Sequence, residues 1–195
     1  IPAGTPGPEA LDMALNTLFM HPNVAPFLAR QFIQKMVTSN PSPAYIERVA
    51  KAFEDNGQGV RGDMKALIRA VLLDAEARDA RLGNNPTFGR LREPVARFIQ
   101  WSRTFGASTN LNRWVIDETS NPARALGQSP LRSPSVFNFF RPNYVPSDAE
   151  FASRNIVGPE FQLLNEVSVA GYVNFMTRMI ANKTNLKADY SGWIE

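Results

Sequence analysis

Residues 42–76 read SPAYIERVAKAFEDNGQGVRGDMKALIRAVLLDAE, and this stretch decides the fold class. Apolar residues recur every three or four positions on both sides of the glycine-containing DNGQG at 55–59, and that period is typical of helices. Ser42 and Asp63 are favourable N-cap residues, and Pro43 suits a first helical position. The stretch therefore predicts two amphipathic helices separated by a turn.

The same helical period extends over much of the chain. It predicts further helices over 8–21, 22–36, 93–105 and 158–182, the last being the longest. We expect the second helix to bury a stripe made of Val24, Phe27, Leu28, Phe32 and Met36. Residues 75–93 are expected to form a loop with one short helix. The proline-rich residues 107–157 form an irregular segment. The predicted fold is an all-α single domain, 1–195, in which five or six main helices form an irregular bundle under this segment.

The composition excludes several classes of protein and site. The chain has 195 residues, of which 44% are hydrophobic and 20% charged, and this balance excludes an intrinsically disordered chain. Cysteine is absent and His21 is the single histidine, so disulfides, thiolate metal sites and thiol nucleophiles are excluded. No cofactor or metal is expected. No apolar run reaches the roughly 20 residues of a membrane-spanning helix.

The basic residues concentrate in one stretch. The net charge is only +3, but six arginines fall between residues 78 and 103, against Asp79 and Glu93. These arginines are Arg78, Arg81, Arg90, Arg92, Arg97 and Arg103. Three interpretations stay open: a solvated or structural role, contact with another region of the same protein, and binding of an anionic ligand or polymer. Nucleic acid is not the expected partner.

The most unusual segment is SVFNFFRPNY at residues 135–144, which holds four aromatic residues. If it is exposed, it is a recognition loop for a glycan, a peptide or a partner surface. If it is buried, it attaches the irregular segment to the helical core, with Asn138 and Arg141 satisfying backbone groups. We favour burial, because phenylalanines are costly to leave in water.

Glu166 is predicted beside the buried face of the last helix. If Glu166 is buried, its carboxylate must be paired, and Arg141 and Arg132 are the candidate partners. Such a pair is first a structural contact and second an acid-base candidate. No catalytic constellation is visible, and whether the protein is an enzyme stays open.

Two further patterns have structural explanations. His21 precedes Pro22 at a predicted helix junction, where we expect it to bond local carbonyls rather than act as a base or ligand. Residues 55–63 imitate a calcium loop, but Gly57 and Gly59 stand where a true loop needs side-chain oxygens. The end of one helix followed by the cap of the next explains this pattern.

Several long stretches together resemble a large bacterial family catalogued as domain of unknown function 1800. The stretches are HPNVAPFLARQFIQKMVTSNPSPAYIERVAKAFEDNGQGVRGDMKALIRAVLLDAEAR, GRLREPVARFIQW, LGQSPLRSPSVFNFFRPNYVP and PEFQLLNEVSVAGYVNFM. The resemblance implies that this chain corresponds to the C-terminal part of a longer family protein. It also implies a periplasmic or extracellular setting, because many members carry an export signal. It supplies no activity and no functional residues.

These observations lead to one functional expectation with two alternatives. We expect a non-catalytic helical module for assembly or binding, whose partner is the preceding region of the same protein or another protein. The alternatives are part of the cleft of an uncharacterised enzyme and a surface for an anionic polymer at residues 78–103. The candidate ligand-binding residues are Arg90, Arg92, Arg97, Asn138, Arg141 and Glu166.

Overall fold

The protein is helical, as the sequence predicts. The computed structural model describes residues 1–111, 113–116 and 118–193. Within these ranges there are α-helices, two short 3-10 helices and one two-stranded sheet, so the all-α expectation is confirmed. Two compact units, 1–90 and 91–195, divide the chain. The expectation of a single domain stays a prediction.

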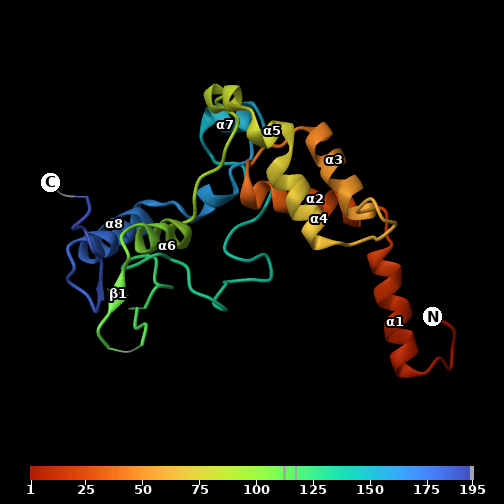
Figure 1. Cartoon of the computed structure of the whole chain (residues 1–195), viewed down its shortest axis with the longest axis horizontal. Helices are drawn as coiled ribbons and strands as arrows, with labels where there is room; N and C mark the ends of the chain where they lie inside the picture. The colour runs from red at the N-terminus through yellow and green to blue at the C-terminus, as the bar shows by residue number, and fades with distance from the viewer. Residues whose placement is uncertain (112, 117, 194–195) are drawn as a thin grey trace. The chain divides into compact units, whose positions relative to one another are not determined.

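Unit 1 is built around three helices that pack on one another, α2 (Val24–Met36), α3 (Pro43–Glu54) and α4 (Met64–Leu73), as Figure 1 shows. Its other elements are α1 (Gly7–Phe19), α5 (Ala75–Arg78) and the 3-10 helix η1 (Ala80–Asn84). The core consists of Ala25, Ala29, Ile33, Tyr45, Val49, Ala50, Phe53, Leu67 and Val71. All of these core residues come from α2, α3 and α4, and none comes from α1.

The helix ends of unit 1 follow the local sequence chemistry. The Ser42 hydroxyl accepts a hydrogen bond from the Tyr45 backbone N–H, so it caps α3 directly before Pro43. Asp63 accepts from the backbone N–H groups of Lys65 and Ala66 and caps α4 in the same way. These two predicted caps are confirmed.

The predicted stripe of α2 is partly wrong. The helix instead buries Ala25, Ala29 and Ile33, which are spaced four residues apart and share one face. Phe27 is 61% exposed and Met36 is also exposed. The reason is that α2 packs against its neighbours through Ala25 and Ala29, whereas the prediction considered only large apolar side chains.

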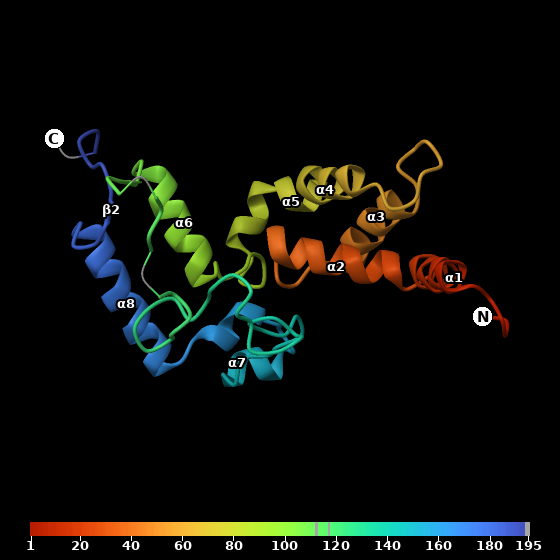
Figure 2. The same ribbon diagram turned by 90° about the horizontal axis from the view of Figure 1, so that it is seen from below.

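Unit 2 pairs two helices with an irregular segment (Figure 2). Its elements are α6 (Pro94–Thr104), β1 (Ser108–Thr109), α7 (Ala149–Ser153), the 3-10 helix η2 (Pro159–Leu163), α8 (Glu166–Ile180) and β2 (Leu186–Lys187). The two strands pair antiparallel, with Ser108 opposite Lys187 and Thr109 opposite Leu186. The core consists of Phe98, Trp101, Ala125, Leu126, Phe175, Met176, Met179, Leu186 and Ala188.

The long last helix begins later than predicted. Residues Pro159–Leu163 form a separate 3-10 turn, and α8 begins at Glu166. The cause is a capping box in which the Asn165 side chain accepts from the Ser168 N–H while the Ser168 hydroxyl accepts from the Asn165 N–H. The helix therefore begins at this box rather than at Pro159.

The irregular segment is attached to the unit 2 core in its first half. Ala125, Leu126 and Gln128 are buried. The Gln128 amide donates to the buried Glu93 carboxylate at 2.7 Å, and its oxygen accepts from the Val95 N–H. At Gly171 a Cβ atom would lie 2.1 Å from the Pro122 carbonyl oxygen, so glycine permits the close approach of the segment to α8.

Candidate functional site

The arginines of the basic stretch lie in different environments. Arg78, Arg81 and Arg90 belong to unit 1, whereas Arg92, Arg97 and Arg103 belong to unit 2. Arg81 forms an ion pair with Asp79 at 2.7 Å. The Arg97 guanidinium lies 4.5 Å from the centre of the Tyr172 ring. Arg90 is half-buried.

Arg92 lies just before α6, and Arg103 lies in its last turn. Together with Ala96, Ile99 and Gln100 they line a hollow of about 310 Å³. Both arginines are exposed, and Ile99 is an exposed apolar residue between them. Two exposed arginines beside an apolar residue form a surface suited to a small anion. Of the basic stretch 78–103, this hollow is the part that we keep as a candidate site.

The structure places Asn138, Arg141 and Glu166 at exposed positions of unit 2. Glu166 begins α8 at an exposed position, so the condition for a buried ion pair is not met. Arg132 instead pairs with Glu118 at 3.0 Å. The Arg141 guanidinium lies 5.6 Å from the centre of the Phe137 ring. The three residues stay ligand-binding candidates by sequence alone.

The aromatic segment is less buried than we favoured. Phe137 is 59% exposed, and Val136 is almost fully exposed. Phe139 and Phe140 are half-buried. The favoured burial is therefore wrong for Phe137, because Ala125, Leu126 and Gln128 already attach the irregular segment to the core.

The segment that imitates a calcium loop connects two helix ends. One Asp55 carboxylate oxygen accepts from the backbone N–H groups of Gly57 and Gly59, both at 2.8 Å. These bonds lower the pKa of Asp55. The Asn56 amide donates to Asp63 at 2.8 Å. The expectation of a helix end followed by a cap is confirmed. His21 differs slightly from expectation, since its Nδ1 accepts from the Asn23 N–H.

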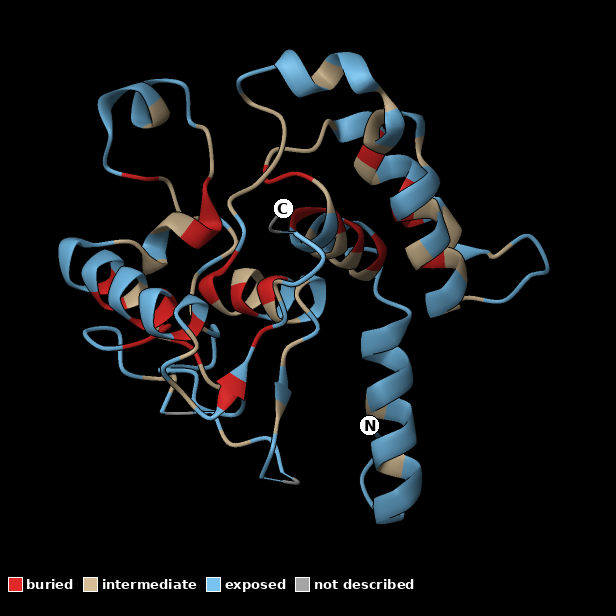
Figure 3. Ribbon diagram, turned by 60° about the vertical axis from the view of Figure 1, so that its left-hand side comes forward, coloured by how far each residue is buried: buried red, intermediate tan, exposed pale blue. Residues whose placement is uncertain are grey.

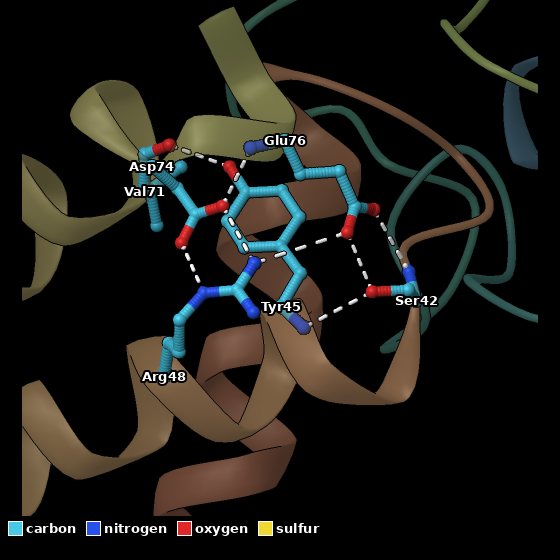
Figure 4. Close-up of polar contacts among 6 residues, drawn as sticks. All are labelled: Ser42, Tyr45, Arg48, Val71, Asp74 and Glu76. Carbon is cyan, nitrogen blue, oxygen red and sulfur yellow. Dashed lines mark hydrogen bonds and ion pairs between the residues drawn. The ribbon is translucent and has the colours of Figure 1, made fainter. Parts of the chain in front are cut away.

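A polar cluster joins α3 to the α4–α5 corner, and Figure 4 shows its residues. The Arg48 guanidinium donates twice to the Asp74 carboxylate, at 2.7 and 2.8 Å. These hydrogen bonds from Arg48 are the main reason that the pKa of the Asp74 carboxyl lies below its ordinary value. Asp74 also accepts from the Glu76 N–H and caps α5. The Glu76 carboxylate accepts from the N–H and the hydroxyl of Ser42.

The centre of this cluster is the fully buried Tyr45. Its hydroxyl donates to the Val71 carbonyl oxygen at 2.5 Å, and burial raises the pKa of the phenol. Ser42 is occupied on both sides, because it donates to Glu76 and accepts from the Tyr45 N–H. The side chains of the cluster bind one another and backbone groups at helix ends. The cluster therefore holds α3, α4 and α5 together. It is a structural feature and not a nucleophilic site.

The most unusual surface in unit 1 belongs to α1. This helix has no buried residue, although Leu11, Leu15 and Leu18 lie on one face at four- and three-residue spacing. Their exposed fractions are 59, 54 and 66%. Figure 3 shows α1 almost entirely in the colour of exposed residues. We call these three residues the leucine stripe.

Only the C-terminal end of α1 is attached to the rest of unit 1. The Arg61 guanidinium donates to the carbonyl oxygens of Phe19, at 3.2 Å, and His21, at 3.5 Å. The Phe19 ring packs edge-on against Phe53, with ring centres 5.9 Å apart. Gly62 lies against Phe19, where a Cβ atom would come within 2.6 Å of the ring. The contacts of Arg61 and Gly62 with Phe19 were not predicted from the sequence, because no local pattern links residues that are so far apart along the chain.

Within 1–111, 113–116 and 118–193, no group of three or more metal-ligating side chains is placed to hold a metal ion. None of the helices in the same ranges combines the length and apolar character needed to cross a membrane.

The fold defines the class as an all-α protein built from two helical units. The chain belongs to the family described as protein of unknown function DUF1800, whose family model matches residues 1–190. No curated protein and no solved structure matches the chain.

Proposed function

We propose that this chain is a non-catalytic helical module for assembly or binding and that the leucine stripe of α1 is the surface it uses. The observation that supports this proposal is the exposure of all three leucines on a helix that has no buried residue. Scattered exposed leucines are ordinary, but a stripe on one helical face is the pattern of a packing surface. The setting that we propose, from the family resemblance, is outside the cytoplasm.

The length of α1 strengthens this inference. The helix has 13 residues, and isolated helices shorter than roughly 12–15 residues are marginally stable in water. Its attachment through Phe19 and Arg61 supports the last turn alone. A surface that covers the leucine stripe would stabilise the remaining turns. Each leucine that becomes fully buried contributes about 1.5–3 kcal/mol.

The charges of α1 favour a protein surface over a lipid surface. The helix carries Glu9 and Asp12 and contains neither lysine nor arginine. Amphipathic helices that bind anionic membranes are rich in basic residues on their polar face. An acidic helix would be repelled by such a membrane, whereas a protein partner can offer basic side chains at the rim of an apolar groove.

The proposal is tested by replacing Leu11, Leu15 and Leu18 together with glutamine. Measured in dilute solution, the free energy of unfolding of the variant should stay within about 0.5 kcal/mol of the parent value, as for other exposed positions. The matched control is Leu67→Gln, since Leu67 is fully buried on α4 and its replacement should cost several kcal/mol. If the triple variant is as unstable as this control, the stripe belongs to the internal core and the proposal fails.

A second candidate function rests on the hollow lined by Arg92 and Arg103. Two exposed guanidinium groups beside the apolar Ile99 suit a carboxylate or phosphate ligand. The test is the retention of the chain on immobilised heparin at low salt. Retention that Arg92→Ala with Arg103→Ala reduces, and that Arg30→Ala with Arg69→Ala leaves unchanged, supports this candidate. Retention that depends equally on all four residues contradicts it.

A further inference from the structure

Resting on the proposed function, we infer that the leucine stripe is covered by the α1 helix of a second copy of this chain, packed antiparallel about a two-fold axis. Leu11, Leu15 and Leu18 follow one another at steps of four and three residues, which is the spacing by which two helices interdigitate along a narrow seam. A two-fold axis requires a surface that is complementary to itself, and a single leucine seam meets this requirement.

The charges around α1 select the antiparallel arrangement. Both acids of the helix, Glu9 and Asp12, lie in its N-terminal half. The guanidinium of Arg61 lies at the C-terminal end, where it binds the carbonyl oxygen of Phe19. An antiparallel pair brings the acidic end of each helix to the basic end of the other, and it also opposes the two helix dipoles. A parallel pair would place both acidic ends together.

The flanks of the stripe fix the register of this pair. Asp12 and Phe19 are seven residues apart and therefore lie on the same flank of the leucine stripe. Arg61 lies over the Phe19 ring, 5.5 Å from its centre. In an antiparallel two-fold pair, like flanks meet. When Leu15 of each copy lies beside Leu18 of the other, Asp12 lies on the same flank as Phe19 and Arg61 of the second copy and within about 3 Å of the level of Phe19 along the helix axis.

The length of the seam sets the expected affinity. Thirteen residues span about 20 Å at the helical rise of 1.5 Å per residue. Two such helices bury less than the roughly 1,200–2,000 Å² of a standard stable interface. We therefore expect a dimer with a dissociation constant in the micromolar range rather than a permanent one.

Analytical ultracentrifugation of the whole 195-residue chain tests the inference. The parent chain should pass from 21.7 kDa to twice that mass as its concentration rises through the micromolar range. Leu15→Glu should raise the dissociation constant by about tenfold or more, as expected for a leucine at the centre of a contact. The matched control is Leu73→Glu, because Leu73 on α4 is 57% exposed against 54% for Leu15. A parent chain that stays monomeric, or equal effects of both variants, overturns the inference.

Single cysteines test the direction of the pair. The chain contains no cysteine, so each introduced thiol reports on its own position. In the antiparallel register, Leu18→Cys lies near the two-fold axis, whereas two copies of Leu11→Cys lie about 16 Å apart along the seam. Disulfides require Cα atoms within about 7 Å. Oxidation should therefore give a covalent dimer for Leu18→Cys and little for Leu11→Cys. Efficient dimers from both variants would contradict the antiparallel pair.

The two proposals fail in different ways. If the parent chain is monomeric and the leucine-to-glutamine variant keeps its stability, a second copy does not cover the leucine stripe. The stripe then stays a binding surface for another partner. A destabilised leucine-to-glutamine variant removes both proposals, because the leucines would then belong to the internal core.

Discussion

The Arg61 guanidinium donates a hydrogen bond to the Phe19 carbonyl oxygen at 3.2 Å and lies 5.5 Å from the centre of the Phe19 ring. A single side chain thus satisfies an orphan carbonyl at the C-terminal end of α1 and stacks on its last aromatic ring. The same guanidinium lies 5.2 Å from the Phe53 ring of α3. These contacts join α1 to the rest of unit 1 while leaving the leucine stripe exposed.

Gly62→Ala should loosen this attachment. The backbone φ of Gly62 is +81°, and an added Cβ would lie 2.6 Å from the tip of the Phe19 ring. The ring must move, so we expect a loss of stability of about 1–3 kcal/mol and faster amide exchange in the last turn of α1. The control is Gly59→Ala, since Gly59 has a φ of +76° with nothing within 4 Å. Chemical denaturation and hydrogen exchange measure both effects. Equal losses in the two variants would show that the contact with Phe19 contributes nothing.

Tyr45→Phe should lower the free energy of unfolding by about 1–3 kcal/mol, because the Val71 carbonyl oxygen would lose its phenol donor inside the core. Tyr190→Phe is the control. Its hydroxyl donates to the Ile180 carbonyl oxygen at the surface, where water can replace it. Urea denaturation of the two variants at neutral pH compares them. A Tyr45→Phe variant as stable as the control would contradict the role of the polar cluster.

Asp74 should make the free energy of unfolding depend on pH in the acid range. Arg48 lowers the pKa of the folded carboxyl, so the unfolded chain binds protons at a higher pH than the folded chain does. The contribution of Asp74 is therefore complete above the unfolded pKa of about 3.9 and is lost as the pH falls through the lower folded pKa. Asp74→Asn should lose about 1–3 kcal/mol at pH 7 and less at acid pH. Denaturation curves across the acid range test this, and a constant difference between the two proteins would contradict it.

The attachment of the irregular segment predicts opposite results at two positions. Gln128→Ala removes a buried donor to the Glu93 carboxylate and should cost about 1–3 kcal/mol, with faster proteolysis within residues 107–157. Phe137→Ala should change stability by less than about 0.5 kcal/mol, because this ring is mostly exposed. The free energy of unfolding and the rate of limited proteolysis distinguish the two positions. A larger loss of stability for Phe137→Ala than for Gln128→Ala would contradict this account and support attachment through the aromatic segment.

Local chemistry made much of the fold predictable. Ser42, Asp63 and Pro94 mark helix starts because caps and first-turn prolines act within three or four residues. The start of α8 was missed for a related reason. The capping box formed by Asn165 and Ser168 sets the start of α8. The upstream Pro159 is compatible with a helix start but does not fix its position.

The contacts that the sequence did not reveal are those between distant residues. Arg61 reaches Phe19 across 42 positions, and Gln128 reaches Glu93 across 35. Periodicity finds that Leu11, Leu15 and Leu18 share a face, but it does not say whether that face is covered. The exposure of the leucine stripe, on which the candidate site depends, therefore required the structure.

Photo-crosslinking at position 15 tests the central claim most directly. A benzophenone amino acid replaces Leu15 in one variant and Thr17, on another face of α1, in the control. Both proteins are irradiated in the cells that produce them, and the products are identified by mass spectrometry. The account predicts one discrete cross-linked protein from position 15 and no such product from position 17. Position 15 giving no discrete product, or the same products as position 17, would contradict the claim that the leucine stripe is a binding surface.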